Sequence, residues 1–292
     1  MKIKIAKYSG FCFGVKRAVK TVFDNLNKNI CLFGAIVNNK YLLNDLKKSS
    51  VFVETNLDKI DKNKIVIIRA HGVGPNIYDK IKLLDLDFID CTCPFVKKIQ
   101  RIVKKNFDSK NKIIIVGNQN HPEIIGINAY ANNSCFIIKN IKEAFIFANR
   151  IQDCDIQIKN KLEKYICVSQ TTFDFKEFSK IKKILENKLN LNLKIYDTIC
   201  DTTYKRQVEA DELSSNYNIV LVIGDETSSN TKKLFDICKK NNKNTFLIED
   251  LADMYKINID LKNKSIAIIA SASTPKYLIE KVNKELEIKY NN

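Results

Sequence analysis

The stretch LDFIDCTCPFVKKIQRIVKK, residues 86–105, ends a β-type run at Cys93 and continues at once into a helical pattern. The same order recurs in KIKIAKYSGFCFGVKRAVK around Cys12 and in LKIYDTICDTTYKRQVEA around Cys200. Each of these cysteines therefore lies where a strand ends and a helix begins. The recurrence indicates about three comparable α/β units that bring one thiol each to a shared centre.

These three cysteines are candidate metal ligands. A helix N-terminus and nearby cations lower the pKa of a thiol, and the thiolate is the form that binds metal. A basic pair follows each cysteine about one turn later: Lys16-Arg17, Lys97-Lys98 and Lys205-Arg206. Iron–sulfur clusters ordinarily take four protein ligands. Three would leave one iron open, as catalytic metal sites keep an open position.

The other cysteines are interpreted differently. The chain has nine, and a thiol that is no ligand behaves as a small buried hydrophobic group. We expect five of them, inside apolar runs, to be packing residues: Cys31, Cys135, Cys154, Cys167 and Cys238. Cys91 stays ambiguous, because it lies two residues from Cys93 and so on the same face of a strand. A zinc site is a weaker alternative, since Cys91-Thr92-Cys93 lacks the usual two-residue spacer.

Bulk properties limit the class of protein. A chain of 292 residues with 45% hydrophobic content fits one large domain or two to three small ones. The odd number of cysteines and the start MKIKIAKYSG, which lacks a signal-type apolar segment, predict a protein of the reducing cytoplasm. No apolar run approaches the roughly 20 residues that span a bilayer.

The net charge of +16 does not by itself indicate nucleic-acid binding. Lys and Arg total 49, and only five of them are Arg, the residue that best forks onto phosphates and bases. The lysines are spread along the whole chain. We therefore expect no nucleic-acid partner and no membrane partner, but a diffuse field that attracts anionic substrates or acidic proteins.

Short β-branched runs alternate with amphipathic stretches, the pattern of parallel sheets covered by helices. The expected strands are Lys2–Lys7, Asn29–Phe33, Lys64–Arg69, Phe88–Asp90, Lys112–Val116, Ser134–Ile138, Tyr165–Ser169, Lys194–Asp197, Ile219–Ile223, Asn244–Ile248 and Ser265–Ala270. Expected helices include Val15–Asn27, Phe95–Lys105, Phe175–Leu189, Lys205–Leu213 and Pro275–Glu287.

Unusual polar residues follow several of the expected strands, at the ends where α/β sheets bind ligands. They are His71, His121, Glu123, Ser169 to Thr172, Ser228 to Asn230 and Ser271 to Thr274. Hydroxyls, amides and helix N-termini form anion sites, and protonated imidazoles would add charge. Each has a structural alternative: helix capping for Ser228 and Ser273, and helix-dipole stabilisation for Glu123. Together they indicate a polyanion pocket with a carboxyl group that can move protons.

Eight motifs, in order along the chain, resemble the 4-hydroxy-3-methylbut-2-enyl diphosphate reductase family, the last enzymes of the methylerythritol phosphate route to isoprenoids. The motifs are GFCFGVKRAV, RAHGV, CTCPFV, NHPE, SQTT, TICDTTYKRQ, SSN and ASTP. The resemblance covers roughly residues 2 to 290. It implies three α/β units around a central 4Fe–4S cluster. The units are expected at 14–93, 94–197 and 198–290, with the N-terminal strand of 1–13 joining the last one.

The resemblance also implies roles for single residues. Cys12, Cys93 and Cys200 match the three cluster ligands, and the open iron would bind the allylic hydroxyl of the substrate. Glu123 matches the residue that delivers protons, and Thr171 a hydroxyl that orients substrate and relays a proton. The residues that match the diphosphate pocket are Asn38, His71, His121, Ser228, Ser229, Asn230 and Ser273. The family takes its electrons from ferredoxin, flavodoxin or a comparable donor.

One position departs from the family pattern. The segment AIVNNKYLL has Asn38 where the family usually has a histidine. An amide can donate a hydrogen bond to phosphate but cannot become cationic near neutral pH. We expect Asn38 still to contact the diphosphate, with a lysine or the general positive field compensating.

Two other classes of function remain as alternatives. A basic RNA-associated or redox-sensing protein would bind nucleic acid with a steep salt dependence and form no product. A zinc hydrolase of phosphate esters would differ in its metal content. The scarcity of Arg and the lack of a basic tail speak against the RNA-binding alternative.

Overall fold

The computed structural model describes residues 2–157, 163–189, 192–257 and 264–291. The chain forms two compact units. The first unit contains residues 1–26, 35–52 and 201–292, and the second contains residues 27–34 and 53–200. Each unit is described separately below.

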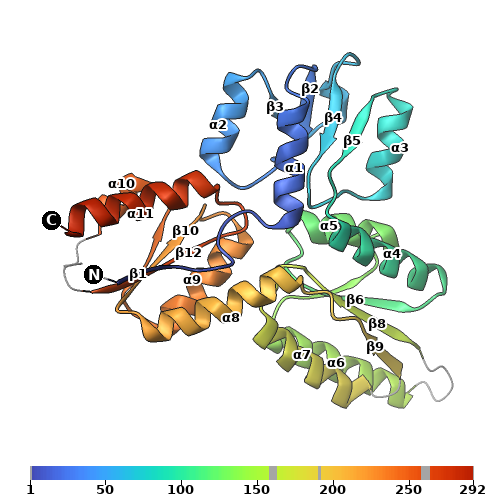
Figure 1. Ribbon diagram of the computed structural model, residues 1–292. Helices are drawn as coiled ribbons and strands as arrows, with labels where there is room; N and C mark the ends of the chain where they lie inside the picture. The colour runs from blue at the N-terminus through green and yellow to red at the C-terminus, as the bar shows by residue number, and fades with distance from the viewer. Residues whose placement is uncertain (1, 158–162, 190–191, 258–263, 292) are drawn as a thin grey trace. The chain divides into compact units, whose positions relative to one another are not determined.

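The first unit is built on a four-stranded sheet in the order β1-β12-β10-β11 (Figure 1). Its strands are β1 (Lys2–Ile5), β10 (Ile219–Ile223), β11 (Thr245–Ile248) and β12 (Ser265–Ala270). All three strand pairs are parallel, and Lys2 lies opposite Ser265, so the first and last strands of the chain are neighbours. The helices of this unit are α1 (Phe13–Asp24), α2 (Lys40–Lys48), α8 (Asp201–Asn216), α9 (Ser229–Asn241), α10 (Leu251–Tyr255) and α11 (Lys276–Asn291).

Both faces of this sheet are buried. Ile219, Leu221 and Ile223 pack on one face with side chains of α10 and α11, while Val220 and Val222 pack on the other face with α8 and α9. Successive side chains of a strand point to opposite faces of the sheet. Because helices cover both faces, the strands are apolar at nearly every position.

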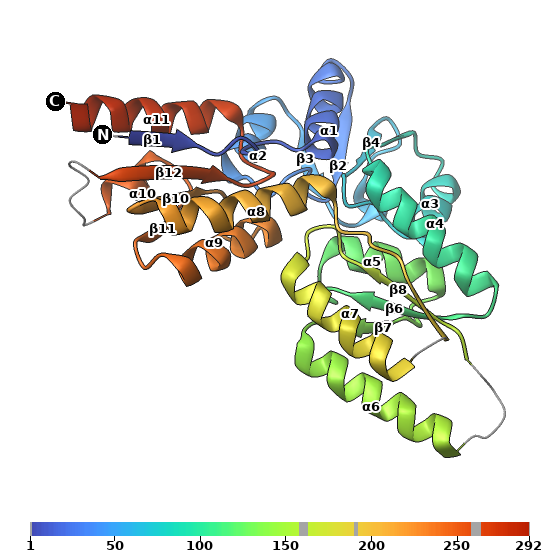
Figure 2. The same ribbon diagram turned by 60° about the horizontal axis from the view of Figure 1, so that its bottom comes forward.

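The second unit carries two further four-stranded sheets, in the orders β3-β2-β4-β5 and β7-β6-β8-β9. The strands are β2 (Ile30–Phe33), β3 (Phe52–Glu54), β4 (Ile65–Ile68), β5 (Phe88–Asp90), β6 (Lys112–Val116), β7 (Phe136–Ile138), β8 (Tyr165–Ser169) and β9 (Leu193–Ile195). The helical segments are η1 (Leu57–Lys59), α3 (Pro75–Leu83), α4 (Pro94–Asp108), α5 (Pro122–Asn128), η2 (Ala129–Ala131), α6 (Ile141–Gln157) and α7 (Phe175–Leu189). Figure 2 shows α6 and α7 on the opposite face of the β6–β8 sheet from α4 and α5.

Three sheets whose described registers are all parallel confirm the predicted α/β class. The expected strands agree with the structure to within about two residues at either end. The sequence analysis missed β3, a three-residue strand whose Phe52 and Val53 are exposed and carry no burial signal. Pro275, expected as a first helical residue, lies one residue before α11. The boundaries 14–93, 94–197 and 198–290 stay a prediction.

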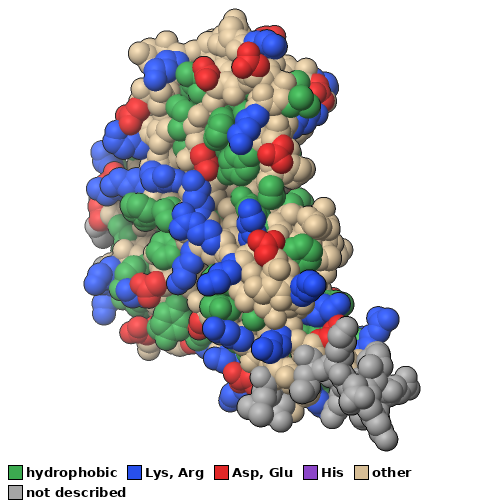
Figure 3. All heavy atoms as spheres, turned by 90° about the vertical axis from the view of Figure 1, so that its right-hand side faces the viewer, with side chains coloured by type: hydrophobic (Ala, Val, Ile, Leu, Met, Phe, Trp, Pro, Cys, Tyr) green, Lys and Arg blue, Asp and Glu red, His purple; other side chains and the backbone are tan. Residues whose placement is uncertain are grey.

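The basic side chains that give the net charge of +16 can be followed on one face of the molecule. Figure 3 shows one face on which basic side chains are spread widely, with acidic and apolar side chains between them. This distribution agrees with the expected diffuse field. No helix in the described ranges is both long and apolar enough to cross a membrane.

Gly72 is a position in the second unit where only glycine fits. Its φ is +71°, and an added Cβ would lie 2.7 Å from both Gln100 Nε2 and Thr92 Cγ2. We expect Gly72→Ala to lower the free energy of unfolding by about 2–3 kcal/mol, because it combines left-handed strain with overlap. Urea denaturation would measure this loss. Gly126→Ala is the control, since its Cβ would meet Gly72 O and Val73 only at 3.4 Å; equal losses in the two variants would contradict the argument.

Candidate functional site

The three candidate ligand cysteines have the same local setting. Cys12 is the N-cap of α1 and Cys93 the N-cap of α4, and neither side chain makes a capping hydrogen bond. Cys200 directly precedes α8. All three are half-buried. Each thiol is thus near the free amide groups of a helix N-terminus. Cys12 belongs to the first unit, and Cys93 and Cys200 belong to the second.

The remaining described cysteines are poorer ligands. Cys31, Cys91, Cys167 and Cys238 are buried. Burial raises the pKa of Cys135, Cys167 and Cys238 to about 12, so these thiols stay protonated near neutral pH. Burial confirms the packing interpretation for Cys31, Cys167 and Cys238, while Cys135 is half-buried. The side chain of Cys154 lies outside the described residues.

Three members of the basic pairs after the cysteines make close contacts with other groups. Lys97 forms an ion pair with Asp90 at 2.7 Å, and Lys205 forms one with Asp201 at 2.6 Å. Arg206 is buried and donates hydrogen bonds to the carbonyls of Tyr8 and Gly10, at 2.7 Å each. Arg206 therefore fixes the segment that leads from β1 to Cys12.

Glu123 and Thr171 form a buried pair in the second unit. They follow β6 and β8, which are parallel neighbours, so both residues lie at the carboxyl edge of one sheet. Thr171 donates to Glu123 twice, from its backbone N at 2.7 Å and from Oγ1 at 2.6 Å. The carbonyl of Thr171 accepts a hydrogen bond from the backbone N of Cys200 at 3.1 Å. One threonine thus connects the carboxyl group to a candidate ligand.

The environment of Glu123 makes it a group that titrates near neutrality. Its side chain is 1% exposed. Burial raises the pKa of Glu123 to about 7, although the two hydrogen bonds from Thr171 act in the opposite direction. A carboxyl group with such a pKa can both hold and release a proton under physiological conditions. The alternative of dipole stabilisation also has a basis, because Glu123 lies in the first turn of α5.

His71 and His121 lie side by side in the same unit. Their rings meet edge to face with centroids 5.3 Å apart. His121 is the N-cap of α5, and its Nδ1 accepts from Glu123 N at 3.2 Å, so its neutral ring carries the proton on Nε2. The Nδ1 atom of His71 is buried and has no hydrogen-bond partner among the described residues. An unsatisfied buried polar atom of this kind suits a site completed by a ligand.

Both imidazoles have lowered pKa values in the ligand-free protein, so near neutral pH they do not meet the condition, protonation, under which they would add positive charge. Burial lowers the pKa of His71 to about 3, with further contributions from His121 and Arg69. Burial and Arg69 lower the pKa of His121 to about 4. Arg69, which no sequence pattern singled out, is the positively charged group that lowers the pKa of both rings. A neutral imidazole still has one N–H group that can donate a hydrogen bond.

The candidate phosphate-binding residues of the first unit also lie at one sheet edge. β10 and β12 are parallel neighbours, and they lead into Ser228 to Asn230 and into Ser271 to Thr274 respectively. Ser228 is the N-cap of α9 and accepts from Thr231 N at 3.4 Å, so the capping alternative holds for it. Ser273 Oγ lies 3.1 Å from Ser271 Oγ. The Nδ2 atom of Asn230 is buried and lacks a partner among the described residues.

Gly224 lets Thr231 and Ser271 pack closely at this edge. An added Cβ there would lie 2.5 Å from Thr231 Oγ1 and 2.6 Å from Ser271 Oγ. Ser229 is half-buried as the first residue of α9. Asn38 is half-buried and directly precedes Asn39, which caps α2 by accepting from Leu42 N at 2.9 Å.

Some polar contacts had no clear signal in the sequence. Thr198 accepts from Ser169 N at 2.7 Å and donates to Ser169 O at 2.8 Å, which fixes the segment before Cys200. Gln100 donates to Val73 O at 3.3 Å, beside His71. Only Gln100 could have been found, because it is a polar residue on the apolar side of a strongly amphipathic helix.

Fold and site define a class: a parallel α/β protein with titratable, hydroxyl and amide groups at strand carboxyl ends and half-buried thiols at helix N-termini. Within that class, the chain belongs to the LytB protein family, whose model matches residues 3–287.

Relatives of known name agree with this assignment. The chain is 41% identical to the 4-hydroxy-3-methylbut-2-enyl diphosphate reductase of Thermoanaerobacter sp. (strain X514), over 98% of this chain and 96% of that protein. It is 38% identical to the enzyme of the same name from Clostridioides difficile (strain 630), over 98% and 99% of the two chains.

Solved structures agree as well. The structure of the E-1-hydroxy-2-methyl-but-2-enyl-4-diphosphate reductase from Plasmodium falciparum is similar with a TM-score of 0.85 at 28% identity, covering 98% of this chain and 88% of that one. A structure of (E)-4-hydroxy-3-methyl-but-2-enyl diphosphate reductase, described as the terminal enzyme of the non-mevalonate pathway, is similar with a TM-score of 0.68 at 30% identity, covering 99% of this chain and all of that one.

Proposed function

We propose that the chain is an iron–sulfur oxidoreductase that converts 4-hydroxy-3-methylbut-2-enyl diphosphate to isopentenyl and dimethylallyl diphosphates. The reaction breaks the allylic C–O bond. It consumes two electrons and two protons: one proton leaves with the hydroxyl group as water, and the other forms a new C–H bond. Addition of that proton to one or the other end of the allylic unit gives the two isomeric products.

The observation that carries this proposal is the Glu123–Thr171 pair. A reductive dehydroxylation needs a proton source that is protonated near neutral pH and shielded from water. Glu123 is buried, and its pKa is raised to about 7, so it is partly protonated there. Thr171 donates hydrogen bonds to Glu123 and accepts one from Cys200 N at its carbonyl oxygen. A single residue therefore links Glu123 to a candidate cluster ligand.

Cys12, Cys93 and Cys200 would hold a 4Fe–4S cluster. No group of three His, Cys, Asp or Glu side chains able to hold a metal ion occurs in the described part of the chain, so this ligand set rests on each cysteine's own setting. Half-buried thiols at helix N-termini fit thiolate ligation, whereas the buried cysteines do not. When bound, such a cluster supplies electrons and an open iron that polarises the allylic hydroxyl group.

The residues of the chain supply the protons. Protonated Glu123 carries its proton on the oxygen that faces Thr171 Oγ1, 2.6 Å away. Thr171 can then accept that hydrogen bond and donate its own hydroxyl proton onward, which makes it a relay. Because the Thr171 backbone N holds the other oxygen of Glu123, the carboxyl group keeps one orientation through the transfer.

Six of the residues named for the diphosphate pocket would donate hydrogen bonds to it. His71 and His121 would donate hydrogen bonds, and the approach of an anion would raise the pKa of both rings. Ser228, Ser229, Asn230 and Ser273 would donate from hydroxyl and amide groups. Asn230 Nδ2 and His71 Nδ1 support this assignment. Each is buried without a hydrogen-bond partner among the described residues, and a phosphate oxygen could be that partner.

Asn38→Ala tests the departure from the family pattern. We expect the KM for the allylic diphosphate to rise about fivefold with little change in kcat, because a neutral donor to phosphate is worth about 1 kcal/mol. Steady-state kinetics would measure the effect. Asn44→Ala, an exposed amide on α2, is the matched control. An unchanged KM and kcat in Asn38→Ala would remove Asn38 from the diphosphate site.

We further propose that an acidic carrier of ferredoxin or flavodoxin type delivers the electrons, guided by the diffuse positive field. A cytoplasmic location would keep the nine thiols reduced.

The direct test of this function is anaerobic turnover. The purified chain with its cluster is incubated with the allylic diphosphate, dithionite and methyl viologen, and products are identified by mass spectrometry. Formation of both five-carbon diphosphates is expected. A preparation with full iron content that consumes no substrate would overturn the proposal.

A further inference from the structure

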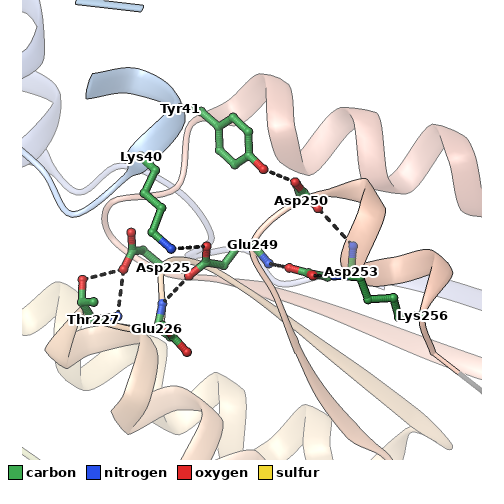
Figure 4. A network of polar contacts seen from close by, with 9 residues as sticks. All are labelled: Lys40, Tyr41, Asp225, Glu226, Thr227, Glu249, Asp250, Asp253 and Lys256. Atoms are coloured by element: carbon green, nitrogen blue, oxygen red, sulfur yellow. Dashed lines mark hydrogen bonds and ion pairs between the residues drawn. The ribbon is translucent and has the colours of Figure 1, made fainter. Parts of the chain in front are cut away.

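One carboxylate in the first unit, that of Glu249, contacts two segments that each carry candidate diphosphate-binding residues. Its Oε2 accepts from Lys40 Nζ at 3.0 Å, and its Oε1 accepts from the backbone N of Glu226 at 3.0 Å (Figure 4). Lys40 follows Asn38 by two residues, and Glu226 precedes Ser228 by two residues. Glu249 itself directly follows β11, beside β10.

The carboxylate is fixed from its own side. The backbone N of Glu249 donates to Asp253 Oδ2 at 3.0 Å, and Asp253 lies in the first turn of α10. Asp250 caps the same helix by accepting from Asp253 N at 3.0 Å. Glu249 therefore projects from a short, well-bonded junction between β11 and α10 rather than from a loose loop.

Tyr41 adds a second connection next to the first. Its hydroxyl donates to Asp250 Oδ2, so Lys40 and Tyr41 hold adjacent acidic residues (Figure 4). This hydrogen bond is the main reason that the pKa of Tyr41 is raised to about 12. The hydroxyl consequently remains a donor throughout the physiological pH range. The two contacts fix the start of α2, and with it the segment that presents Asn38.

The segment on the other side is also well defined. Asp225 Oδ1 accepts from Thr227 N at 2.8 Å and from Thr227 Oγ1 at 2.5 Å. The carbonyl of Asp225 accepts from Ser228 N at 3.1 Å. These bonds make residues 225–228 a compact turn. A displacement of Glu226 is therefore passed on to Ser228 and the start of α9.

Stability alone does not account for this arrangement. The Lys40 side chain is 60% exposed and that of Glu249 is 22% exposed. Exposed ion pairs contribute little to folding because water screens them. The same contact nevertheless joins positions 209 residues apart in sequence. Its main effect is on where the two segments lie.

We propose that Lys40 and Glu249 are positioning residues that hold the Asn38 segment and the Ser228–Asn230 segment in one arrangement for the diphosphate. This inference rests on the proposed function, because it assigns a diphosphate to those segments. Neither residue needs to touch the substrate for the effect to occur.

The test compares Lys40→Met, Glu249→Gln and the double variant with the wild-type holoenzyme. Glu249→Gln keeps an oxygen that can accept from Glu226 N but loses the ion pair. We expect each single change to raise the KM about fivefold and to weaken calorimetric binding of inorganic diphosphate equally, with kcat within about twofold. The double variant should be no worse than either single one, since both remove the same interaction.

Two further variants separate positioning from general structure. Lys40→Arg keeps the ion pair and should restore the wild-type KM. Lys182→Met breaks an exposed Lys182–Glu186 pair on α7 and should change nothing. Unchanged KM and diphosphate binding in Lys40→Met and Glu249→Gln would overturn the inference. So would a joint fall of kcat and urea midpoint in those variants, because that result would assign the pair a structural role.

The proposed function is decided by product formation in the wild-type protein, and the positioning role by the variants. A wild-type protein that binds inorganic diphosphate but forms no product would remove the reductase proposal. The binding measurements on the variants would still decide whether the ion pair positions the site.

Discussion

Glu123→Gln is expected to lower kcat by about 10²- to 10⁴-fold, the usual contribution of a general acid. The cluster and the KM should be retained, because glutamine keeps the shape of the side chain. Its oxygen can accept from Thr171 N, and its amide can donate to Thr171 Oγ1, so both contacts of the native carboxyl group have a replacement. What the variant lacks is a transferable proton.

The pH dependence follows from the same group. Glu123 must be protonated to act, and its pKa is raised to about 7, so activity is expected to fall as pH rises through about 7. The folded-state pKa exceeds the ordinary value of 4.5, so the folded protein binds more protons between these values. Stability from this group therefore decreases as pH rises from about 4.5 to about 7, and Glu123→Gln should lose that dependence.

Steady-state kinetics and urea denaturation, each from about two pH units below to about two above the Glu123 pKa, would measure both effects. Glu186→Gln, on the exposed face of α7, is the control and should behave as wild type. Full activity in Glu123→Gln would remove Glu123 from the mechanism. If the residual activity of Glu123→Gln still fell as pH rises, the pH dependence would belong to another group.

Cys93→Ser is expected to lose the cluster, with activity falling below detection. A serine hydroxyl has a far higher pKa than a thiol and is a harder ligand, so it does not replace a thiolate on iron. Cys12→Ser and Cys200→Ser should give the same result. Iron and sulfide analysis and the visible absorption spectrum of anaerobically purified protein would measure it.

Cys91→Ala is the matched control, because Cys91 lies only two residues from Cys93 but is 1% exposed. It should keep the full iron content and most of its activity. An intact cluster in Cys93→Ser together with a lost cluster in Cys91→Ala would move the ligand assignment to Cys91. Retention of the cluster in both variants would exclude this segment from cluster binding.

Much of the fold could be predicted from the sequence because its strands are buried on both faces. Ile219–Ile223 is apolar throughout, Lys112–Val116 is apolar after its first residue, and a glycine follows each, so both strand type and strand end could be predicted. The three-residue strand β3 could not be predicted in this way, because its mostly exposed side chains give no apolar pattern in the sequence. The parallel pairing of β1 with β12 joins the two ends of the chain, which local patterns do not encode.

The candidate site was predictable in its members but not in its contacts. Position at a strand end predicted Glu123 and Thr171, yet the two hydrogen bonds between them depend on which strands are neighbours. The lowered pKa of His71 could not be predicted from the sequence, because burial and the charges of His121 and Arg69 act through space. Lys40 and Glu249 gave no signal, since an exposed lysine and a glutamate 209 residues later are ordinary surface residues until folding pairs them.

The measurement that tests the central claim most directly is iron and acid-labile sulfide content per chain after strictly anaerobic purification. We predict a brown protein with about four irons and four sulfides per chain. A colourless protein that binds zinc, and that takes up no iron and sulfide on reconstitution, would contradict the account.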